Sequence, residues 1–292
     1  MKSYETPLNE ATVAIAGLGL MGGSLGLALR GRVRRVIGIA RRAETVEQAL
    51  AIGAIDDGAA DLSAAADADL IVLATPVGVI LRQIEQIGTL AAQGRLRDGV
   101  VVTDMGSTKA AICAHAARLW PAPRRFVGCH PMAGSEKSGP EHASASLYNN
   151  SVCFIEESAD LDPEAVRLVR ELWQRSGARV VNVQPALHDV ILASTSHIPH
   201  IMATLLATSA VERGASREFA GNGFRDMTRL AEGSPEMWRD ITLTNREAVM
   251  EGLEVLRGQL NDFLTAVERS DAQALMQFFE AGREARRQVF TP

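Results

Sequence analysis

The residues best suited to chemistry lie in one short segment, GCHPMAGSEKSG at residues 128–139. It holds a histidine, a serine, a glutamate and a lysine between glycines, and it directly follows the apolar pair Phe126 and Val127. Because Pro131 favours an extended conformation for the residue before it, we expect His130 to project from the end of a strand. Histidine titrates near neutral pH, which makes His130 the best candidate for a general base that removes an alcohol proton. A histidine that only binds loop carbonyls would show the same pattern, and this segment alone favours neither interpretation.

A second segment, residues 13–22, predicts a dinucleotide site. An apolar run ends at Gly17, and Gly19 and Gly22 complete the pattern G-x-G-x-x-G before an apolar, alanine-containing helix to residue 29. Gly17 permits a tight turn, Gly19 lets the backbone approach a pyrophosphate, and Gly22 lets the helix pack on the strand. The phosphates would lie at the helix N-terminus, where free N–H groups and the helix dipole favour anions. We expect cofactor contacts from Gly17, Gly19, Leu20, Met21 and Gly22; a glycine-rich turn in another α/β protein is the alternative.

The residues after the second expected strand, 35–40, bear on which dinucleotide binds. NAD enzymes commonly have an acidic residue there that holds the ribose 2′-hydroxyl. This chain has Ala40, Arg41 and Arg42, and no acidic residue occurs between Arg32 and Ala43. A guanidinium can grip a 2′-phosphate that a carboxylate would repel. We therefore predict NADP as the preferred cofactor, with NAD possible; a solvated start of a helix would also explain the two arginines.

These segments sit in an alternation of strands and helices that predicts an α/β fold with a Rossmann-type doubly wound parallel sheet. A strand at 69–74 ends at Thr75 and Pro76, on the edge where cofactors lie, and the helix 77–92 follows. A strand at 100–104 precedes a helix that ends at residue 119. Apolar segments at 151–156 and 178–183, separated by an amphipathic helix at 163–175, are expected to extend the same sheet.

The segment DMGSTK, residues 104–109, follows the strand at 100–104. Ser107 can be interpreted as a helix N-cap, as a ligand-side residue, or as both. Asp104 and Lys109 have the same ambiguity, and we expect Lys109 to be an exposed helix residue.

From about residue 184 only helices are expected. The apolar stretch 186–212 contains Ser196 to His200, where His197 and His200 share a helical face and Pro199 should kink the helix. Two packed histidines are the simple explanation, and no third ligand at useful spacing indicates a metal. Ser234 and Pro235 suit the start of a long helix that continues through Asn245. Helices of this length predict a dimer core, so we divide the chain into a nucleotide-binding domain at 1–184 and an all-α C-terminal dimerisation domain at 185–292.

Composition narrows the class of protein. The chain has 292 residues, a formal net charge of −5 and 47% hydrophobic residues, which is ordinary for a globular protein and does not suggest a broad nucleic-acid-binding surface. Its three cysteines, Cys113, Cys129 and Cys153, show no metal-ligand spacing and suggest a reducing compartment. The N-terminus lacks the apolar core of a signal peptide, and we expect no apolar run long enough to span a bilayer. We expect a cytoplasmic homodimer without nucleic-acid or membrane partners.

Taken together, the motifs resemble the prephenate and arogenate (cyclohexadienyl) dehydrogenases of tyrosine biosynthesis over nearly the whole chain. The resemblance rests on five segments: GLGLMGGSLG at 17–26, DMGSTK at 104–109, GCHPMAGSEKSG at 128–139, SHIPH at 196–200 and GFRDMTRLAEGSPEMWRDI at 223–241. It implies oxidative decarboxylation of a cyclohexadienyl substrate with hydride transfer to a nicotinamide.

The resemblance also assigns roles to residues. His130 would accept the proton of the ring hydroxyl, and Ser107 would steady His130 and lie near the nicotinamide. Arg229 would bind a substrate carboxylate, a task that its fork of donors suits. The pocket would be shaped by His197, His200, Ser135, Glu136 and Trp238. The histidine at position 200 resembles prephenate-using members more than strict arogenate enzymes, and use of both substrates is possible.

Two other functions fit parts of the sequence. A β-hydroxyacid dehydrogenase shares the plan of a Rossmann domain followed by helices, but it predicts a lysine on the helical domain, and no lysine follows Lys137. A non-catalytic NADP-sensing protein would tolerate the loss of His130.

Overall fold

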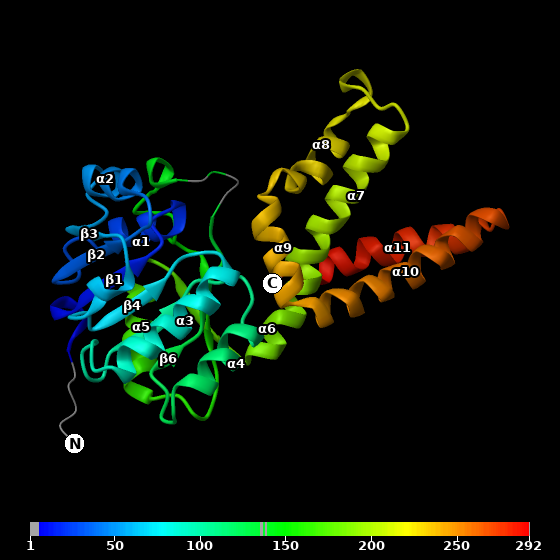
Figure 1. Ribbon diagram of the computed structural model, residues 1–292. Coiled ribbons are helices and arrows are strands. Elements are labelled where there is room, and N and C mark those ends of the chain that lie inside the picture. Colours follow the sequence, from blue (N-terminus) through cyan, green and yellow to red (C-terminus); the bar gives the residue numbers. More distant parts are fainter. Residues whose placement is uncertain (1–5, 135–136, 138, 292) are drawn as a thin grey trace. The chain divides into compact units, whose positions relative to one another are not determined.

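The first half of the protein folds around a six-stranded parallel sheet with the strand order β3-β2-β1-β4-β5-β6. Figure 1 shows the computed structural model, which describes residues 6–134, 137 and 139–291. The strands are β1 (Thr12–Ala16), β2 (Arg35–Ile39), β3 (Asp57–Ala59), β4 (Leu70–Leu73), β5 (Val101–Asp104) and β6 (Phe126–Val127). From β1 the chain first adds β2 and β3 on one side and then β4, β5 and β6 on the other. The predicted doubly wound fold is therefore confirmed.

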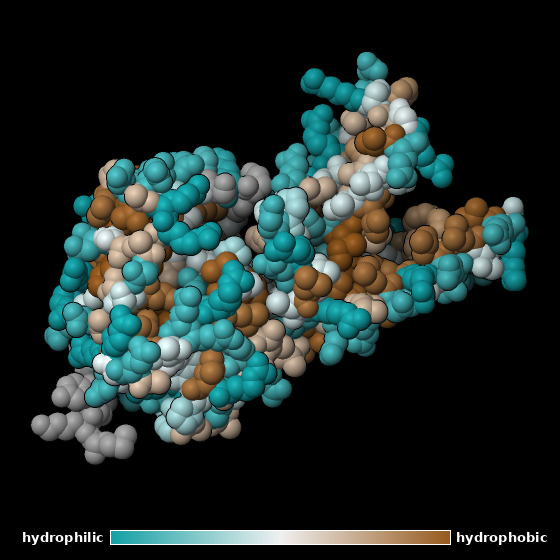
Figure 2. Space-filling view, viewed as in Figure 1, coloured by the Kyte–Doolittle hydropathy of each residue, from teal (hydrophilic) through white to brown (hydrophobic). Residues whose placement is uncertain are grey.

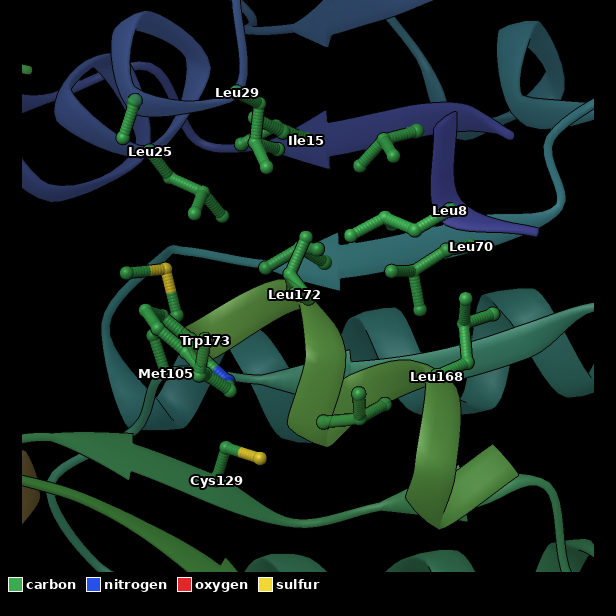
Figure 3. Packing of buried hydrophobic residues seen from close by; sticks show 14 of the residues in the cluster. Leu8, Ile15, Leu25, Leu29, Leu70, Met105, Cys129, Leu168, Leu172 and Trp173 are labelled. Atoms are coloured by element: carbon green, nitrogen blue, oxygen red, sulfur yellow. The ribbon is translucent and has the colours of Figure 1, made fainter. Parts of the chain in front are cut away.

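Helices cover both faces of this sheet because its central strands are apolar on both sides. In β1, Val13 and Ile15 join one buried cluster, and the alternate residues Ala14 and Ala16 join the other. The helices of the nucleotide-binding half are α1 (Leu20–Leu29), α2 (Ala43–Ala51), α3 (Val77–Ala92), α4 (Ala110–Leu119) and α5 (Pro163–Arg175). Residues of α1, α2 and α5 pack on one face, and residues of α3 and α4 pack on the other. Figure 3 shows Trp173 of α5 among the residues of the first cluster.

The last strands do not extend this sheet, and that expectation was wrong. β7 (Cys129–Pro131), β8 (Val152–Glu156) and β9 (Arg179–Val183) form a second sheet, in which β7 runs antiparallel to β8. The chain leaves the first sheet at Gly128, whose N–H donates to a carboxylate oxygen of Glu156 at 3.0 Å. A Cβ at Gly128 would lie 2.4 Å from the sulfur of Cys113, so only glycine fits this close approach. His130 therefore sits on a short strand of its own rather than at the end of a parallel strand.

The second half is helical, as expected, but its helices break at different places. Residues 185–212 form α6 (Pro185–Leu192), a π-helical turn (Ala193–His197) and α7 (Ile198–Glu212). The helix was expected to kink at Pro199, but its irregular part is this π turn. Pro199 lies in the first turn of α7, where its missing N–H costs little. Then follow α8 (Asn222–Thr228), a 3₁₀ turn (Arg229–Glu232) and α9 (Pro235–Thr244). Other 3₁₀ turns are Leu8–Glu10, Leu62–Ala65, Pro140–His142 and Arg217–Phe219.

Contacts within the chain divide it into two compact units, one up to Asn245 and the other from Arg246 on. The long helix expected from Pro235 therefore breaks at Asn245, which ends α9 and turns its side chain into the first unit. The second unit is a hairpin of α10 (Arg246–Glu268) and α11 (Ala272–Phe290), drawn in orange and red in Figure 1. Phe263 of α10 packs on Phe278 of α11 with ring centroids 4.9 Å apart. The domain boundary expected at 184/185 remains a prediction.

One helical stretch among the described residues, Pro185–Glu212, is long and apolar enough to cross a membrane, with a mean hydropathy of 1.4. The expectation that no run has this length was therefore wrong. A single such helix is weak evidence for a membrane, because core helices of globular proteins pass the same test. In this protein the stretch carries the buried polar residues His188, Asp189 and His197, which bind other parts of the chain.

Candidate active site

The turn between β1 and α1 has the geometry of a phosphate cradle. Gly17 adopts φ +107°, and a Cβ there would lie 2.5 Å from the carbonyl oxygen of Ala74. A Cβ at Gly22 would lie 1.8 Å from the carbonyl oxygen of Gly17, so the helix can pack this closely only with glycine. Gly19 differs, because nothing lies within 4 Å of the place where its Cβ would be. The open space at Gly19, before the first amides of α1 at Leu20, fits a dinucleotide pyrophosphate.

A cavity of about 730 Å³ continues from this turn past the carboxyl ends of β1, β2 and β4. Its lining includes Gly17, Thr75 and three arginines, Arg41, Arg42 and Arg82. Arg82 comes from α3, some forty positions after the other two, and sequence reasoning missed it. Other lining residues include Ala40, Asp61, Gln83 and Gln86. The Asp61 carboxylate is engaged by Ser63, which donates its backbone N–H at 2.8 Å and also its hydroxyl.

The remaining cofactor candidates lie around the same edge. The Thr75 hydroxyl donates to Gln83 at 2.7 Å, and Pro76 is the N-terminal capping position of α3. Met21 accepts a hydrogen bond from the Tyr148 hydroxyl through its carbonyl at 2.6 Å, which ties α1 to the segment before β8.

His130 is buried on β7, and its ring is held by a second histidine. Nδ1 of His130 lies 2.9 Å from Nε2 of His188, which belongs to α6. Burial, followed by the nearby His188, Lys109 and His197, lowers the pKa of His130 well below its usual value. The imidazole is therefore neutral at pH 7 and able to accept a proton. Ser107 was expected to steady His130, but Nδ1 of His130 bonds to His188. Ser107 is half-buried on the turn before α4.

The other ring nitrogen of His188 leads to a carboxylate that caps a helix. His188 Nδ1 lies 2.7 Å from Oδ1 of Asp189. Asp189 also accepts the backbone amides of Lys109, the N-cap residue of α4, at 2.7 Å and of Ala110, its first residue, at 2.9 Å. Ser107 is therefore not the N-cap of this helix. The backbone amides at the start of α4 donate to the Asp189 carboxylate of α6 instead.

Lys109 is buried rather than exposed, which corrects the sequence interpretation. Its ammonium pairs with Asp104, and the same carboxylate accepts the backbone amides of Gly106 at 2.8 Å and Cys129 at 3.0 Å. Burial alone would lower the pKa of Lys109, but Asp104 outweighs burial and the pKa is raised. Burial raises the pKa of Asp104 as well, against the effect of Lys109. The raised pKa of Lys109 favours its charged form, whereas the raised pKa of Asp104 favours a neutral carboxyl. Because the carboxylate accepts three hydrogen bonds, we assign the pair as ionic.

The helical histidines form a second cluster with Trp238 of α9. The ring of His200 stacks on Trp238 with centroids 3.7 Å apart and planes inclined by 17°, and His197 meets the same indole edge-on at 6.2 Å. Burial lowers the pKa of His197 to about 4 and also lowers the pKa of His200. A Cβ at Gly233 would lie 2.4 Å from the indole nitrogen, so this stack requires a glycine beside it.

The last expected substrate residues are placed less tightly. Arg229 is exposed at the start of a 3₁₀ turn that packs against α7. Ser135 and Glu136 lie outside the described residues. Within the described ranges, no three His, Cys, Asp or Glu side chains gather as metal ligands would.

Comparison with known proteins decides the family. Residues 25–182 match the family model of the prephenate dehydrogenase nucleotide-binding domain, and residues 184–281 match that of the prephenate dehydrogenase dimerization domain. The chain belongs to the prephenate dehydrogenase family. It is 34% identical to prephenate dehydrogenase of Bacillus subtilis over 282 residues, 94% of this chain and 75% of that protein. It is 29% identical to cyclohexadienyl dehydrogenase of Zymomonas mobilis, covering 94% of each chain.

Solved structures of this family have the same architecture. Prephenate dehydrogenase from Aquifex aeolicus, in complex with hydroxyphenyl propionate and NAD⁺, superposes with a TM-score of 0.87 at 29% identity. The match covers 97% of this chain and all of that one. Arogenate dehydrogenase of Synechocystis gives a TM-score of 0.80 at 28% identity over 95% of this chain. A β-hydroxyacid dehydrogenase, the rival enzyme considered from the sequence, is not favoured.

Sequence reasoning did not identify the residues that surround the proposed base. His188 and Asp189 lie 58 and 59 positions after His130, and Asn245 lies 56 positions after Asp189. The available signal was a histidine and an aspartate side by side in an apolar helix, where unpaired polar groups are costly.

Proposed function

We propose that the protein catalyses the oxidative decarboxylation of prephenate in tyrosine biosynthesis, with NADP as its preferred cofactor. One observation carries the proposal: a buried, neutral His130, bound on one side to His188, in a chain that also has a dinucleotide cradle. The ligands named for the Aquifex aeolicus relative, hydroxyphenyl propionate and NAD⁺, support an aromatic acid and a nicotinamide. We propose prephenate, with arogenate as the second substrate, because His200 resembles that of the prephenate-using members.

In this proposal His130 is the general base. A bound nicotinamide supplies a hydride acceptor beside the substrate ring. His130 would take the proton of the ring hydroxyl while the carbon that bears this hydroxyl loses a hydride to the nicotinamide. The carboxyl group would leave as carbon dioxide, and the electron pair of the broken C–C bond would pass into the ring. The ring then becomes aromatic, which drives the reaction, and its phenolate oxygen would take the proton back from His130. The chain needs only to orient the substrate and to accept and return one proton. Ser107, on the turn after β5, would lie near the nicotinamide.

Arg229 is our candidate for binding a substrate carboxylate, with His197, His200, Trp238, Ser135 and Glu136 around the ring. A charged hydrogen bond of this kind contributes about 1.5–3 kcal/mol, so Arg229→Ala should raise KM for prephenate about 10- to 100-fold, with a smaller change in kcat. Steady-state kinetics at saturating cofactor measure both constants. Arg225→Ala removes another exposed arginine, four residues earlier, and serves as the control. An unchanged KM in the Arg229 variant would place the carboxylate elsewhere.

The preference for NADP rests on Arg41 and Arg42, with Arg82 as a third guanidinium in the same cavity. The double change Arg41→Ala with Arg42→Ala should weaken NADP binding by about 10- to 100-fold, since each guanidinium can donate charged hydrogen bonds to the 2′-phosphate. NAD lacks this phosphate, so its Kd should change by less than about threefold. Calorimetric titration without substrate measures both values, and Arg213→Ala with Arg217→Ala controls for the lost charge. Equal weakening of NADP and NAD would contradict the preference.

We also propose a homodimer that forms through the helical half. Figure 2 shows apolar surface over helices of this half, where exposed apolar residues recur. They are Leu187, Val190, Ile191, Leu205, Leu206, Val255, Leu260, Leu264, Met276, Phe278 and Phe279. Exposed apolar residues gathered in this way on the helices of each unit are characteristic of subunit interfaces. The three buried, unpaired cysteines are consistent with a cytoplasmic location.

The experiment that tests the function is direct. Prephenate and arogenate are offered separately with NADP and with NAD, and reduction of the cofactor is followed by absorbance. Turnover in any combination supports the reaction class, and the four rates rank substrates and cofactors. Folded protein that binds NADP but turns over neither substrate would point to the sensor function instead.

A further inference from the structure

Behind the proposed base lies a chain of three side chains that ends on a helix. His130 binds His188 at 2.9 Å, His188 binds Asp189 at 2.7 Å, and Asp189 accepts the backbone amides of Lys109 and Ala110 at the start of α4. All three residues are at least nine-tenths buried, with exposed fractions of 9%, 1% and 3%. The rings of His130 and His188 meet edge-on, and Phe154 of β8 packs edge-on against His188 from another side. This packing leaves His188 one orientation.

The chemistry of the donors fixes where the protons are. An ionised carboxylate only accepts hydrogen bonds, so His188 must donate its Nδ1–H to Asp189. When the His188 ring carries a single proton, that proton is on Nδ1, so the other nitrogen, Nε2, can only accept. His130 must therefore donate its own Nδ1–H to His188 Nε2, and its remaining nitrogen, Nε2, keeps a free lone pair. A base needs that lone pair to receive a proton.

A branch of the same network reaches a third histidine, His197. The Asn245 amide nitrogen donates to the backbone carbonyl of Asp189 at 2.8 Å and lies 3.1 Å from Nδ1 of His197. Because an amide nitrogen donates only, Nδ1 of His197 accepts, and Nε2 of His197 carries the proton. The hydrogen bonds around Asp189 thus fix which ring nitrogen carries the proton in two histidines. Nε2 of His130 can accept a proton, and Nε2 of His197 can donate one.

We infer that His188 and Asp189 are positioning residues that hold His130 in the tautomer with a bare Nε2 and a protonated Nδ1. This inference rests on the proposed role of His130 as the base. A serine protease aspartate gives a precedent for the size of such effects: its loss selects the wrong histidine tautomer and lowers kcat by about 10⁴. In the present protein, the helix dipole of α4 and its two amides keep Asp189 in place.

Two amide variants of His188 test the inference because they differ by one methylene. His188→Gln places an amide oxygen near the former Nε2, where it can accept from His130 Nδ1–H. His188→Asn reaches only the position of Nδ1, so it can bind Asp189 but not His130. We expect the Gln variant to keep kcat within about threefold. The Asn variant, and likewise His188→Phe, should lose at least about tenfold in kcat, and at most the 10²- to 10⁴-fold that a general base contributes. KM for substrate and Kd for cofactor should change less than about twofold.

The tautomer itself can be observed without any turnover. Long-range ¹H–¹⁵N correlation spectra of ¹⁵N-histidine-labelled protein distinguish the two ring nitrogens, and the His130→Asn variant assigns the signal. The wild-type spectrum should show His130 protonated on Nδ1 alone, and the Phe variant should show a fraction protonated on Nε2. A wild-type His130 protonated on Nε2 would overturn the inference, as would a Phe or Asn variant with wild-type kcat. If the Phe variant does not fold, the wild-type spectrum still decides. A wild-type enzyme without turnover that shows the expected tautomer would contradict only the proposed function.

Discussion

Replacing His130 by asparagine is expected to lower kcat by about two to four orders of magnitude, the range typical of a general base. Asparagine retains a polar side chain of similar reach at Nδ1, so the contact with His188 can persist while the basic nitrogen is lost. The Kd for NADP should stay within about twofold, because the cradle at Gly17–Gly22 does not involve this residue. Stopped-flow and steady-state absorbance measure the chemical step, and titration without substrate measures cofactor binding.

The pH profile gives the same prediction an independent readout. Burial lowers the pKa of His130, so the neutral, active form persists below the usual histidine pKa and is lost only as pH falls further. In the wild type, kcat/KM should therefore decline on the acid side with a midpoint below about 6.5, the ordinary histidine value. This acid limb should be absent from the His130→Asn variant. His142→Asn changes an exposed histidine and should leave rate and profile unchanged. Near-normal turnover in the first variant would remove His130 from the mechanism.

Replacing Lys109 by methionine is expected to reduce the free energy of unfolding by about 3–5 kcal/mol, the cost of breaking a buried ion pair on one side. The variant keeps the length of the side chain but leaves Asp104 without its counter-charge in a fully buried site. Urea denaturation followed by circular dichroism gives the difference. Arg213→Met removes an exposed cation and should change stability by no more than about 0.5 kcal/mol.

The loss in the Lys109 variant should depend on pH. Burial raises the pKa of Asp104, and without Lys109 this effect acts unopposed by the ammonium. A carboxyl whose folded-state pKa lies above its unfolded value stabilises the fold at low pH, and that contribution disappears as pH rises through the folded pKa. The variant should therefore be least impaired in acid and most impaired near neutrality. Adding Asp104→Asn should recover part of the loss, but not all, because one amide oxygen cannot accept from both Gly106 and Cys129. A Lys109→Met variant as stable as wild type would mean that the pair is not ionic.

Local signals in the sequence predicted much of this fold. Gly17 and Gly22 predicted a tight turn and a closely packed helix, and the structure has both. Ser234 is the N-cap of α9, as predicted, and its hydroxyl accepts a hydrogen bond from the amide of Met237. The helix at 77–92 was predicted to the residue, because apolar side chains at Ile80, Ile84 and Ile87 recur at helical spacing. Each of these features depends on residues a few positions apart, which a single sequence records.

Features that depend on distant residues could not be predicted in this way. Lys109 looks like an ordinary first-turn lysine until β5 places Asp104 beneath it and β7 covers both. Strands β8 and β9 have the composition of sheet extensions, and only the approach of Gly128 to Cys113 and Glu156 shows why the chain leaves the first sheet. Arg82 joins Arg41 and Arg42 through the packing of α3, which no spacing in the sequence reveals.

The cap that Asp189 provides for α4 also bears on how such enzymes can recombine. The proposed base His130 is encoded upstream of residue 184, near the junction of the two family models, while His188 and Asp189, the residues that we infer orient it, are encoded just downstream. A crossover between two relatives at that junction would join a base from one parent to His188 and Asp189 from the other. The recombinant protein would then keep a correctly oriented His130 only if α4 has the same geometry in both parents, because the start of α4 holds Asp189. A crossover after Leu192 would pass on the base, its partners and the capped helix as one heritable block.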